Sequence, residues 1–340
     1  MRHLVFVEPG RLEWQDTPDP EPGPGQAVVR PLAVARCDLD AAMAGFGIFP
    51  GPYPVGHEIA AEVVAVSDGV THIEEGQRVA VPFQVSCGRC TPCAGGRYAA
   101  CDPYYARAGA AFGFGDAGGG HGGGLTDLLL IPDAGHLLVP APESINDVAL
   151  ATIPDNVIDA YRTVVDALRE RPGADVLIVG GDAPSISLYT ILCAQALGAG
   201  SVRYADNDPQ RLAAASDLGA DVIDVGPQFP RRLERAPIVV GASLSVEGLH
   251  CAIRSTEPYG RLTVVSIHFA AETPLPMLEM YTRGITLHTS RADSRRYLPE
   301  VLELVAAGRI DPLAVPTTVV GWDDAAEHWL DPALKLVVTS

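Results

Sequence analysis

The most constraining feature of the sequence is a quartet of cysteines with the spacing Cys87-x2-Cys90-x2-Cys93-x7-Cys101. Four thiolates on one short lobe can close a tetrahedral shell around Zn²⁺, with bonds of about 2.3 Å. A closed shell of four sulfurs leaves no position for a substrate, so the predicted zinc has a structural role. The alternatives are two disulfides or four unrelated thiols.

The N-terminal segment indicates the cellular compartment, and the net charge limits the possible binding partners. The first residues form too short an apolar stretch for a signal peptide and are better interpreted as a strand. We therefore expect a cytoplasmic protein, in a reducing compartment that favours zinc over disulfides. No apolar run reaches the ~18 residues that a membrane span needs. Acids exceed bases by 42 − 24 = 18, which disfavours binding to nucleic acid. Lys335 is the only lysine, and we interpret this arginine bias as a coding preference.

The N-terminal part of the chain has a β-type pattern. The length of 340 residues predicts about two domains, at ~150 residues each. Short apolar runs, such as 27–30 and 59–66, are separated by Gly and Pro, which predicts a barrel-like or sandwich-like β domain. The Gly-rich segment 118–124 predicts a mobile surface loop.

The pattern changes in the second half, where buried-strand runs alternate with helical stretches. Repeated β-α units predict a parallel, doubly wound sheet. A helix at 297–307 and a strand at 335–338 are expected to return to the first domain. The expected strands are 175–179, 202–205, 221–225, 237–241 and 261–267, and the expected helices include 188–195, 209–218 and 246–254.

A second cluster of metal-binding residue types is formed by Cys37, His57 and Glu58. Thiolate, imidazole and carboxylate groups are all good zinc ligands. Asp40 lies three residues after Cys37, and its carboxylate could accept the other ring N–H of a zinc-bound His57. Taken alone, these residues are more often structural, and Asp40 can equally be a solvated surface residue.

Together, the quartet, Cys37-x2-Asp40, Gly56-His57-Glu58, the later β-α units and the closing strand resemble the zinc-dependent medium-chain alcohol dehydrogenases. The resemblance covers essentially the whole chain. It implies a GroES-like catalytic domain (1–157 and 292–340, with the zinc lobe at 87–101) and a Rossmann domain (158–291). It also implies two zinc ions per chain, a small alcohol or carbonyl substrate, and a homodimer or homotetramer.

The resemblance also supplies a last ligand for the second zinc. Members of the family place a Cys, Asp or Glu just before the coenzyme domain, and Asp155 matches that position. The expected catalytic ligands are thus Cys37, His57 and Asp155, with Glu58 as a near or exchangeable ligand and Asp40 orienting His57.

A dinucleotide loop is expected after strand 175–179. Gly180 and Gly181 begin it, but Ser187 stands where the third glycine belongs, and Asp182 adds a charge beside the phosphate. Asp206 follows Ser187 by 19 residues, close to the ~20 expected for the acid that binds the adenosine ribose. No arginine adjoins this acid in sequence, so NAD is favoured over NADP. By resemblance, Arg211, Ser266 and Ile267 also belong to the cofactor site.

The site lacks the hydroxyl that relays the substrate proton in typical alcohol dehydrogenases, because the matching positions are Leu39 and Ala42. Water, His268 or Tyr53 would have to move the proton instead. The leading hypothesis is an NAD(H)-dependent zinc oxidoreductase acting on CH–OH groups. The alternatives are reduction of an iminium or activated C=C bond, which needs no hydroxyl relay, and a non-catalytic binding protein of the same family.

Overall fold

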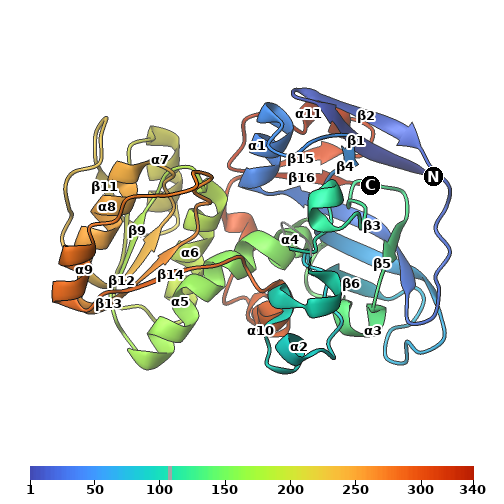
Figure 1. Cartoon of the computed structure of the whole chain (residues 1–340), viewed down its shortest axis with the longest axis horizontal. Helices are drawn as coiled ribbons and strands as arrows, with labels where there is room; N and C mark the ends of the chain where they lie inside the picture. Colours follow the sequence, from blue (N-terminus) through green and yellow to red (C-terminus); the bar gives the residue numbers. More distant parts are fainter. Residues whose placement is uncertain (106–108) are drawn as a thin grey trace. The chain divides into compact units, whose positions relative to one another are not determined.

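The computed structural model describes residues 1–105 and 109–340, and these form two compact units (Figure 1). The first unit contains Met1–Ile158, Ala292–Gly308 and Thr317–Ser340, and the second contains Asp159–Arg291 and Arg309–Pro316. The sequence placed all of 292–340 in the first domain, whereas the structure groups Arg309–Pro316 with the second unit. The predicted combination of a β-rich domain and a domain with a doubly wound parallel sheet is confirmed.

The first unit is built on two sheets. A three-stranded antiparallel sheet has the order β2-β1-β4, and a larger sheet has the order β15-β16-β3-β5-β6-β8, with β7 also paired to β3. The strands are β1 (Arg2–Glu8), β2 (Arg11–Asp16), β3 (Ala27–Arg36), β4 (Tyr53–Pro54), β5 (Glu58–Val66), β6 (Arg78–Val81), β7 (Leu129–Ile131), β8 (Val139–Pro140), β15 (Thr317–Gly321) and β16 (Lys335–Thr339). The C-terminal strand β16 thus returns to the first unit, as the sequence predicted.

Short helices connect these strands. They are α1 (Asp38–Phe46), α2 (Thr91–Ala94), α3 (Ala134–Leu137), α4 (Asp147–Thr152), α10 (Ser294–Ala306) and α11 (Ala325–His328). Single helical turns add η1 (Tyr98–Ala100), η2 (Asp102–Tyr104), η3 (Gly115–Gly118), the π-helical turn η4 (Ile153–Val157) and η5 (Pro312–Ala314), of which η5 belongs to the second unit.

The central strands of the larger sheet bring distant segments together. Strand β3 is apolar along most of its length and is buried between β5 and β16. In this register Ala35 pairs with Glu58, and Arg36 pairs with Leu336. The residues that follow β3, begin β5 and begin β16 therefore meet at one end of the sheet.

The Gly-rich segment 118–124 lies at the surface only in part: Gly119 and Gly120 are exposed, but its C-terminal end is packed, which the prediction of a mobile surface loop did not include. Gly123 and Gly124 are buried, and the Gly124 N–H donates to the Gly56 carbonyl at 2.7 Å. A Cβ atom at Gly123 would lie 2.4 Å from the Val55 carbonyl oxygen. Only glycine permits so close an approach of two backbones. The segment therefore supports the backbone that leads into His57.

The second unit contains a six-stranded parallel sheet with the order β11-β10-β9-β12-β13-β14, the doubly wound order that the sequence predicted. Among the described residues, no helix combines the length and apolar character needed to cross a membrane. The strands are β9 (Val176–Val179), β10 (Val202–Asp206), β11 (Asp221–Asp224), β12 (Ala236–Gly241), β13 (Thr256–Val264) and β14 (Thr286–Thr289), and the helices are α5 (Ile158–Glu170), α6 (Pro184–Ala196), α7 (Pro209–Asp217), α8 (Val246–Ser255) and α9 (Met277–Arg283).

Candidate active site and metal centres

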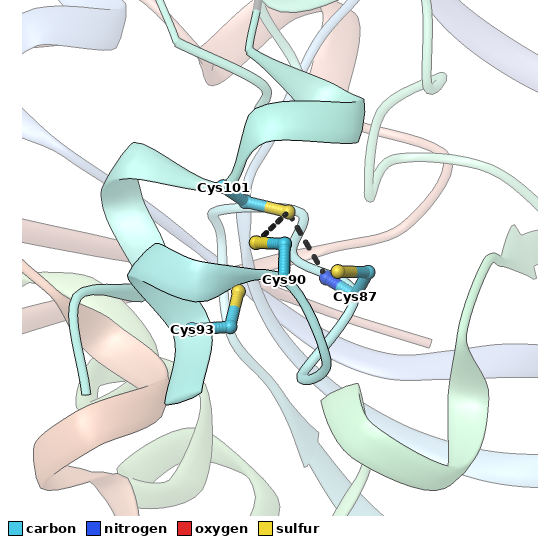
Figure 2. Close-up of side chains that lie close together, drawn as sticks. All are labelled: Cys87, Cys90, Cys93 and Cys101. Atoms are coloured by element: carbon cyan, nitrogen blue, oxygen red, sulfur yellow. Dashed lines mark hydrogen bonds between the residues drawn. The ribbon is translucent and has the colours of Figure 1, made fainter. Parts of the chain in front are cut away.

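The cysteine quartet converges around α2 and η1, and Figure 2 shows the four side chains gathered in one lobe. Their sulfur atoms all lie within 4.8 Å of one another, and no cysteine of the chain is in a disulfide. The sulfurs of Cys90 and Cys101 are 3.9 Å apart. Zn–S bonds of about 2.3 Å in a tetrahedron place sulfurs about 3.8 Å apart, so the cluster has the size of a structural zinc shell.

The second predicted cluster also assembles. Single ligand atoms of Cys37, His57, Glu58 and Asp155 lie within 4.8 Å of one another, and all four residues are buried. Cys37 follows β3, and His57 and Glu58 stand at the start of β5. Neighbouring antiparallel strands therefore fix three of the four side chains.

Asp155 comes from a helical irregularity. It lies in η4, the π-helical turn between α4 and α5, where Pro154 provides no N–H to the helical ladder. Single π-helical turns inside helices are frequent at functional sites. The Asp155 Oδ2 atom lies 3.3 Å from His57 Nε2.

Asp40 connects two of the clustered residues. Its Oδ2 atom accepts the Cys37 backbone N–H at 3.1 Å, and its Oδ1 atom lies 3.2 Å from His57 Nδ1. Asp40 is itself 3% exposed, so it is not a solvated surface carboxylate. The imidazole is therefore held with Nδ1 toward Asp40 and Nε2 toward Asp155.

Two further residues of this cluster were missed by the sequence analysis. The Lys335 ammonium donates to Glu58 Oε1 at 2.6 Å, to Asn156 Oδ1 at 2.5 Å and to the Arg36 carbonyl at 3.0 Å. Asn156 is fully buried beside Asp155. The only lysine of the chain was a signal for this site, because it stands in the closing strand where a buried cation needs partners.

The charges of the cluster fit a divalent cation. Three buried carboxylates and a thiol lie around His57 and one buried lysine. Although burial opposes it, Asp40 and Asp155 raise the pKa of His57 well above its usual value, so the cluster favours added positive charge. Burial raises the pKa of Glu58 to about 8, although Lys335 opposes this, and burial also raises the pKa of the Cys37 thiol. The Glu58 Oε2 atom is buried without a hydrogen-bond partner among the described residues. A cation reverses these costs by binding the deprotonated forms.

Apolar side chains surround the imidazole. The His57 ring centroid lies 5.3 Å from that of Phe83 and 5.1 Å from that of Phe114. Leu39 packs, partly buried, against the same apolar cluster together with Phe49. The absence of a hydroxyl at Leu39 therefore coincides with an apolar environment on this side of His57.

The predicted dinucleotide loop forms a strand-turn-helix unit between β9 and α6. Gly181 has φ +138°, and a Cβ atom at Gly180 would lie 2.3 Å from Asp206 Oδ2, so both positions require glycine. The N-terminus of α6 has no side-chain cap, and a helix N-terminus is a favourable place for an anion. The Asp182 carboxylate accepts the Leu244 N–H at 2.7 Å. The unit fits a dinucleotide, with Asp182 as its departure from the usual pattern.

Asp206 is paired with an arginine, although no arginine adjoins it in the sequence. Arg211 donates to both of its carboxylate oxygens, and the Tyr204 hydroxyl donates to Oδ2 at 2.9 Å. The sequence missed this because Arg211 lies five positions away, one helical turn into α7. Arg211 Nη1 also lies 3.8 Å from Asp208 Oδ2, so two carboxylates face one guanidinium and the net charge remains negative.

The other predicted cofactor residues fall into two groups. Ser187 is buried inside α6, where its hydroxyl donates to the Pro184 carbonyl at 2.9 Å. Ser266 and Ile267 follow β13 at the carboxyl edge of the sheet. The Ser266 hydroxyl and His268 Nε2 are buried with no hydrogen-bond partner in the described part of the chain, so a ligand could satisfy both.

Comparisons with known proteins agree with this architecture. Residues 23–143 match the alcohol dehydrogenase GroES-like domain. The chain is 30% identical to an alcohol dehydrogenase of Rhizobium meliloti (strain 1021), over 91% of this chain and 89% of that protein. It is 32% identical to a glutathione-independent formaldehyde dehydrogenase of Pseudomonas aeruginosa, over 74% of this chain but only 64% of that protein.

Solved structures of known proteins also share this fold. The alcohol dehydrogenase TADH from Thermus sp. ATN1 superimposes with a TM-score of 0.87 and 25% identity, over 100% of this chain and 99% of that one. The chain therefore belongs to the zinc-type alcohol dehydrogenases of the medium-chain dehydrogenase/reductase superfamily.

Proposed function

We propose that the protein transfers hydride between NAD(H) and a small alcohol or carbonyl substrate at the buried cluster of Cys37, His57 and Asp155. The observation that carries the proposal is the convergence of these donors, with Glu58, within 4.8 Å of one another. Similarity to alcohol and formaldehyde dehydrogenases supports small alcohols and aldehydes as the substrate class.

Each residue of the cluster has a distinct task in this proposal. Cys37 and Asp155 provide two anionic ligands and His57 a neutral one, while Asp40 fixes the tautomer and orientation of the imidazole. Lys335 donates to one carboxylate oxygen of Glu58, and the other oxygen would make this residue an exchangeable ligand. When bound, zinc supplies a Lewis acid for the substrate oxygen, and NAD(H) accepts or donates the hydride. A second zinc in the cysteine quartet stabilises its lobe.

The preference for NAD rests on charge. A 2′-phosphate at the end of β10 would meet Asp206 and Asp208, and their shared partner Arg211 is already engaged by both. Among these three residues, the 2′-phosphate of NADP would therefore find no unpaired cation. Its negative charge would be repelled by the two carboxylates.

The residues at the usual relay positions cannot carry the substrate proton. Leu39 and Ala42 cannot donate or accept a proton, so water or another group must carry it. This observation favours one further candidate function, reduction of an iminium or activated C=C bond, because such reactions do not need a hydroxyl at this place.

A panel of alcohols, aldehydes, ketones, imines and enones, followed by NADH absorbance, separates these functions. We expect turnover with small alcohols and aldehydes, and formaldehyde belongs in the panel. Turnover restricted to imines or enones would favour the second candidate. Tight NADH binding without turnover of any class would identify a binding protein instead.

We also propose that the protein works as a homo-oligomer in the reducing cytoplasm. The seven cysteines are all free thiols, which suits that compartment. Helix α9, which precedes the edge strand β14 in the sequence, exposes Leu278 at 74% and Tyr281 at 83%. Contiguous exposed apolar side chains are a feature of interaction surfaces. Light scattering during size-exclusion chromatography would give the oligomeric state.

A further inference from the structure

The amide of Asn156 contacts two of the proposed metal ligands at once. Its Nδ2 group donates to the Cys37 sulfur at 3.2 Å and to Asp155 Oδ2 at 3.1 Å. An amide NH₂ group has two donors, and these two contacts use both. Asn156 is fully buried, so no solvent competes for them.

Lys335 determines which way this amide points. The ammonium has only donors, so the atom of Asn156 that faces it at 2.5 Å must be the oxygen. The nitrogen must then face Cys37 and Asp155. An amide turned by 180° would place its oxygen against a thiolate and a carboxylate and would lose the bond to Lys335, so the observed orientation is strongly preferred.

Lys335 is itself fixed in place. It begins β16, is 1% exposed, and donates to three acceptors contributed by Arg36, Glu58 and Asn156. These three contacts use all the donors of a single ammonium group. In a chain whose other basic residues are all arginine, this is a place where a compact cation with three donors is required.

From these contacts we infer that Asn156, oriented by Lys335, is a positioning residue that fixes Cys37 and Asp155 through its two N–H donors and tunes the metal that they would hold. The inference rests on the proposed function, because it assumes that these residues bind a cation. Hydrogen bonds to thiolate and carboxylate ligands fix their geometry and draw electron density from them. A metal held by these ligands would thus be a stronger Lewis acid.

The test uses the full-length protein loaded with Co²⁺, whose thiolate charge-transfer absorbance reports the electron density on sulfur. The cysteine quartet contributes its own thiolate absorbance. The absorbance that comes from Cys37 is therefore the part of the spectrum that disappears in Cys37→Ser. Asn156→Leu removes the N–H donors, so this part should move to longer wavelength. Release of the corresponding zinc to a chelator should become about 10–100-fold faster.

A double-mutant cycle tests the role of Lys335. If Lys335 acts through Asn156, Lys335→Met should shift the Cys37 absorbance in the same direction as Asn156→Leu. Adding it to Asn156→Leu should then produce little further shift. A full additional shift would show that Lys335 acts through Glu58 alone and would overturn this part of the inference.

Two further variants guard against a mere loss of stability. Asn146→Leu changes the same residue type at the N-cap of α4, where its side chain accepts the Ala149 N–H, and it should leave the absorbance unchanged. If Lys335→Met does not fold, Asn156→Asp keeps an acceptor for Lys335 but replaces the N–H group by oxygen, and it should still shift the band.

The outcomes separate the two proposals. If wild type and Cys37→Ser have identical spectra, the cluster does not bind metal through Cys37 and the proposed function fails. If they differ, but Asn156→Leu and Asn156→Asp leave the absorbance and the rate of zinc release unchanged, the role of Asn156 is wrong and the proposed function stands.

Discussion

Arg211 donates two hydrogen bonds to Asp206, from Nε to Oδ2 at 2.9 Å and from Nη2 to Oδ1 at 2.7 Å. Asp206 is completely buried beneath this contact, whereas the Arg211 side chain is 21% exposed. The pair stands at the end of β10, beside Gly180 of the dinucleotide loop. In the NAD site that we propose, the Asp206 carboxylate therefore engages the guanidinium that the 2′-phosphate of NADP would otherwise contact.

Asp206→Ser should shift the cofactor preference toward NADP. Without its carboxylate partner, Arg211 can donate to a phosphate, and one negative charge is removed. We expect the ratio of kcat/KM for NADP⁺ to that for NAD⁺ to rise by about tenfold, equivalent to ~1.4 kcal/mol. The control is Asp208→Ser, because serine also caps a helix and the Asp206–Arg211 pair remains. Equal losses with both cofactors in Asp206→Ser would contradict this role of the pair.

Cys93→Ser should release one zinc ion per chain and lower the melting temperature. Three remaining thiolates bind zinc less tightly, and a structural site contributes folding free energy directly. The matched control is Cys251→Ser in α8, where the cysteine is buried but lies outside both metal clusters. Elemental analysis with thermal unfolding checks the outcome. An unchanged zinc content in Cys93→Ser would refute the structural site.

Asp155→Ala should remove the other zinc and most of the activity. The metal would keep Cys37 and His57 but would lose one anionic ligand, and loss of a ligand weakens binding strongly. Asp147→Ala, in the same helical run but partly exposed, serves as the control. Retained zinc with full turnover would transfer the role to Glu58, which Glu58→Gln would then reveal.

Leu39→Ser should modestly increase alcohol oxidation, most clearly below pH 8. The hydroxyl can donate to and accept from the substrate oxygen, and proton transfer by a well-placed group contributes about 10²–10⁴-fold. A group added to an apolar wall should give far less than this. Leu39→Ala is the control, because it opens the same space without a hydroxyl. Initial rates across pH with both variants are the measurement, and an equal effect of both variants would exclude a relay.

Local spacing made much of this protein predictable. The quartet, the β-α alternation and the positions of Cys37 and His57 could be read from residue type at short spacing or at strand ends. Asp155 came only from the family resemblance, because it lies in a π-helical turn 98 positions from His57. The Lys335–Asn156 contact joins residues 179 positions apart, and no local pattern encodes it. The Asp206–Arg211 pair depends on how α7 turns after β10.

The Gly-rich segment shows a second limit. The high glycine content of residues 118–124 stands out in the sequence. The same composition is compatible with a mobile loop and with a backbone packed against another backbone. Burial at Val55 and Gly56 decides between them, and burial is a property of the whole fold.

The most direct test of the proposed function follows deuterium from [4-²H]NADH into an aldehyde substrate. The NADH carries the deuterium on the face of C4 from which the hydride is transferred. We predict that mass spectrometry and NMR will find the deuterium on the carbinol carbon of the alcohol product. Transfer should stop in Asp155→Ala, whose quartet zinc is intact. Deuterium found only in products of C=N or C=C reduction, or no transfer to any substrate by zinc-replete protein that binds NADH, would contradict the account.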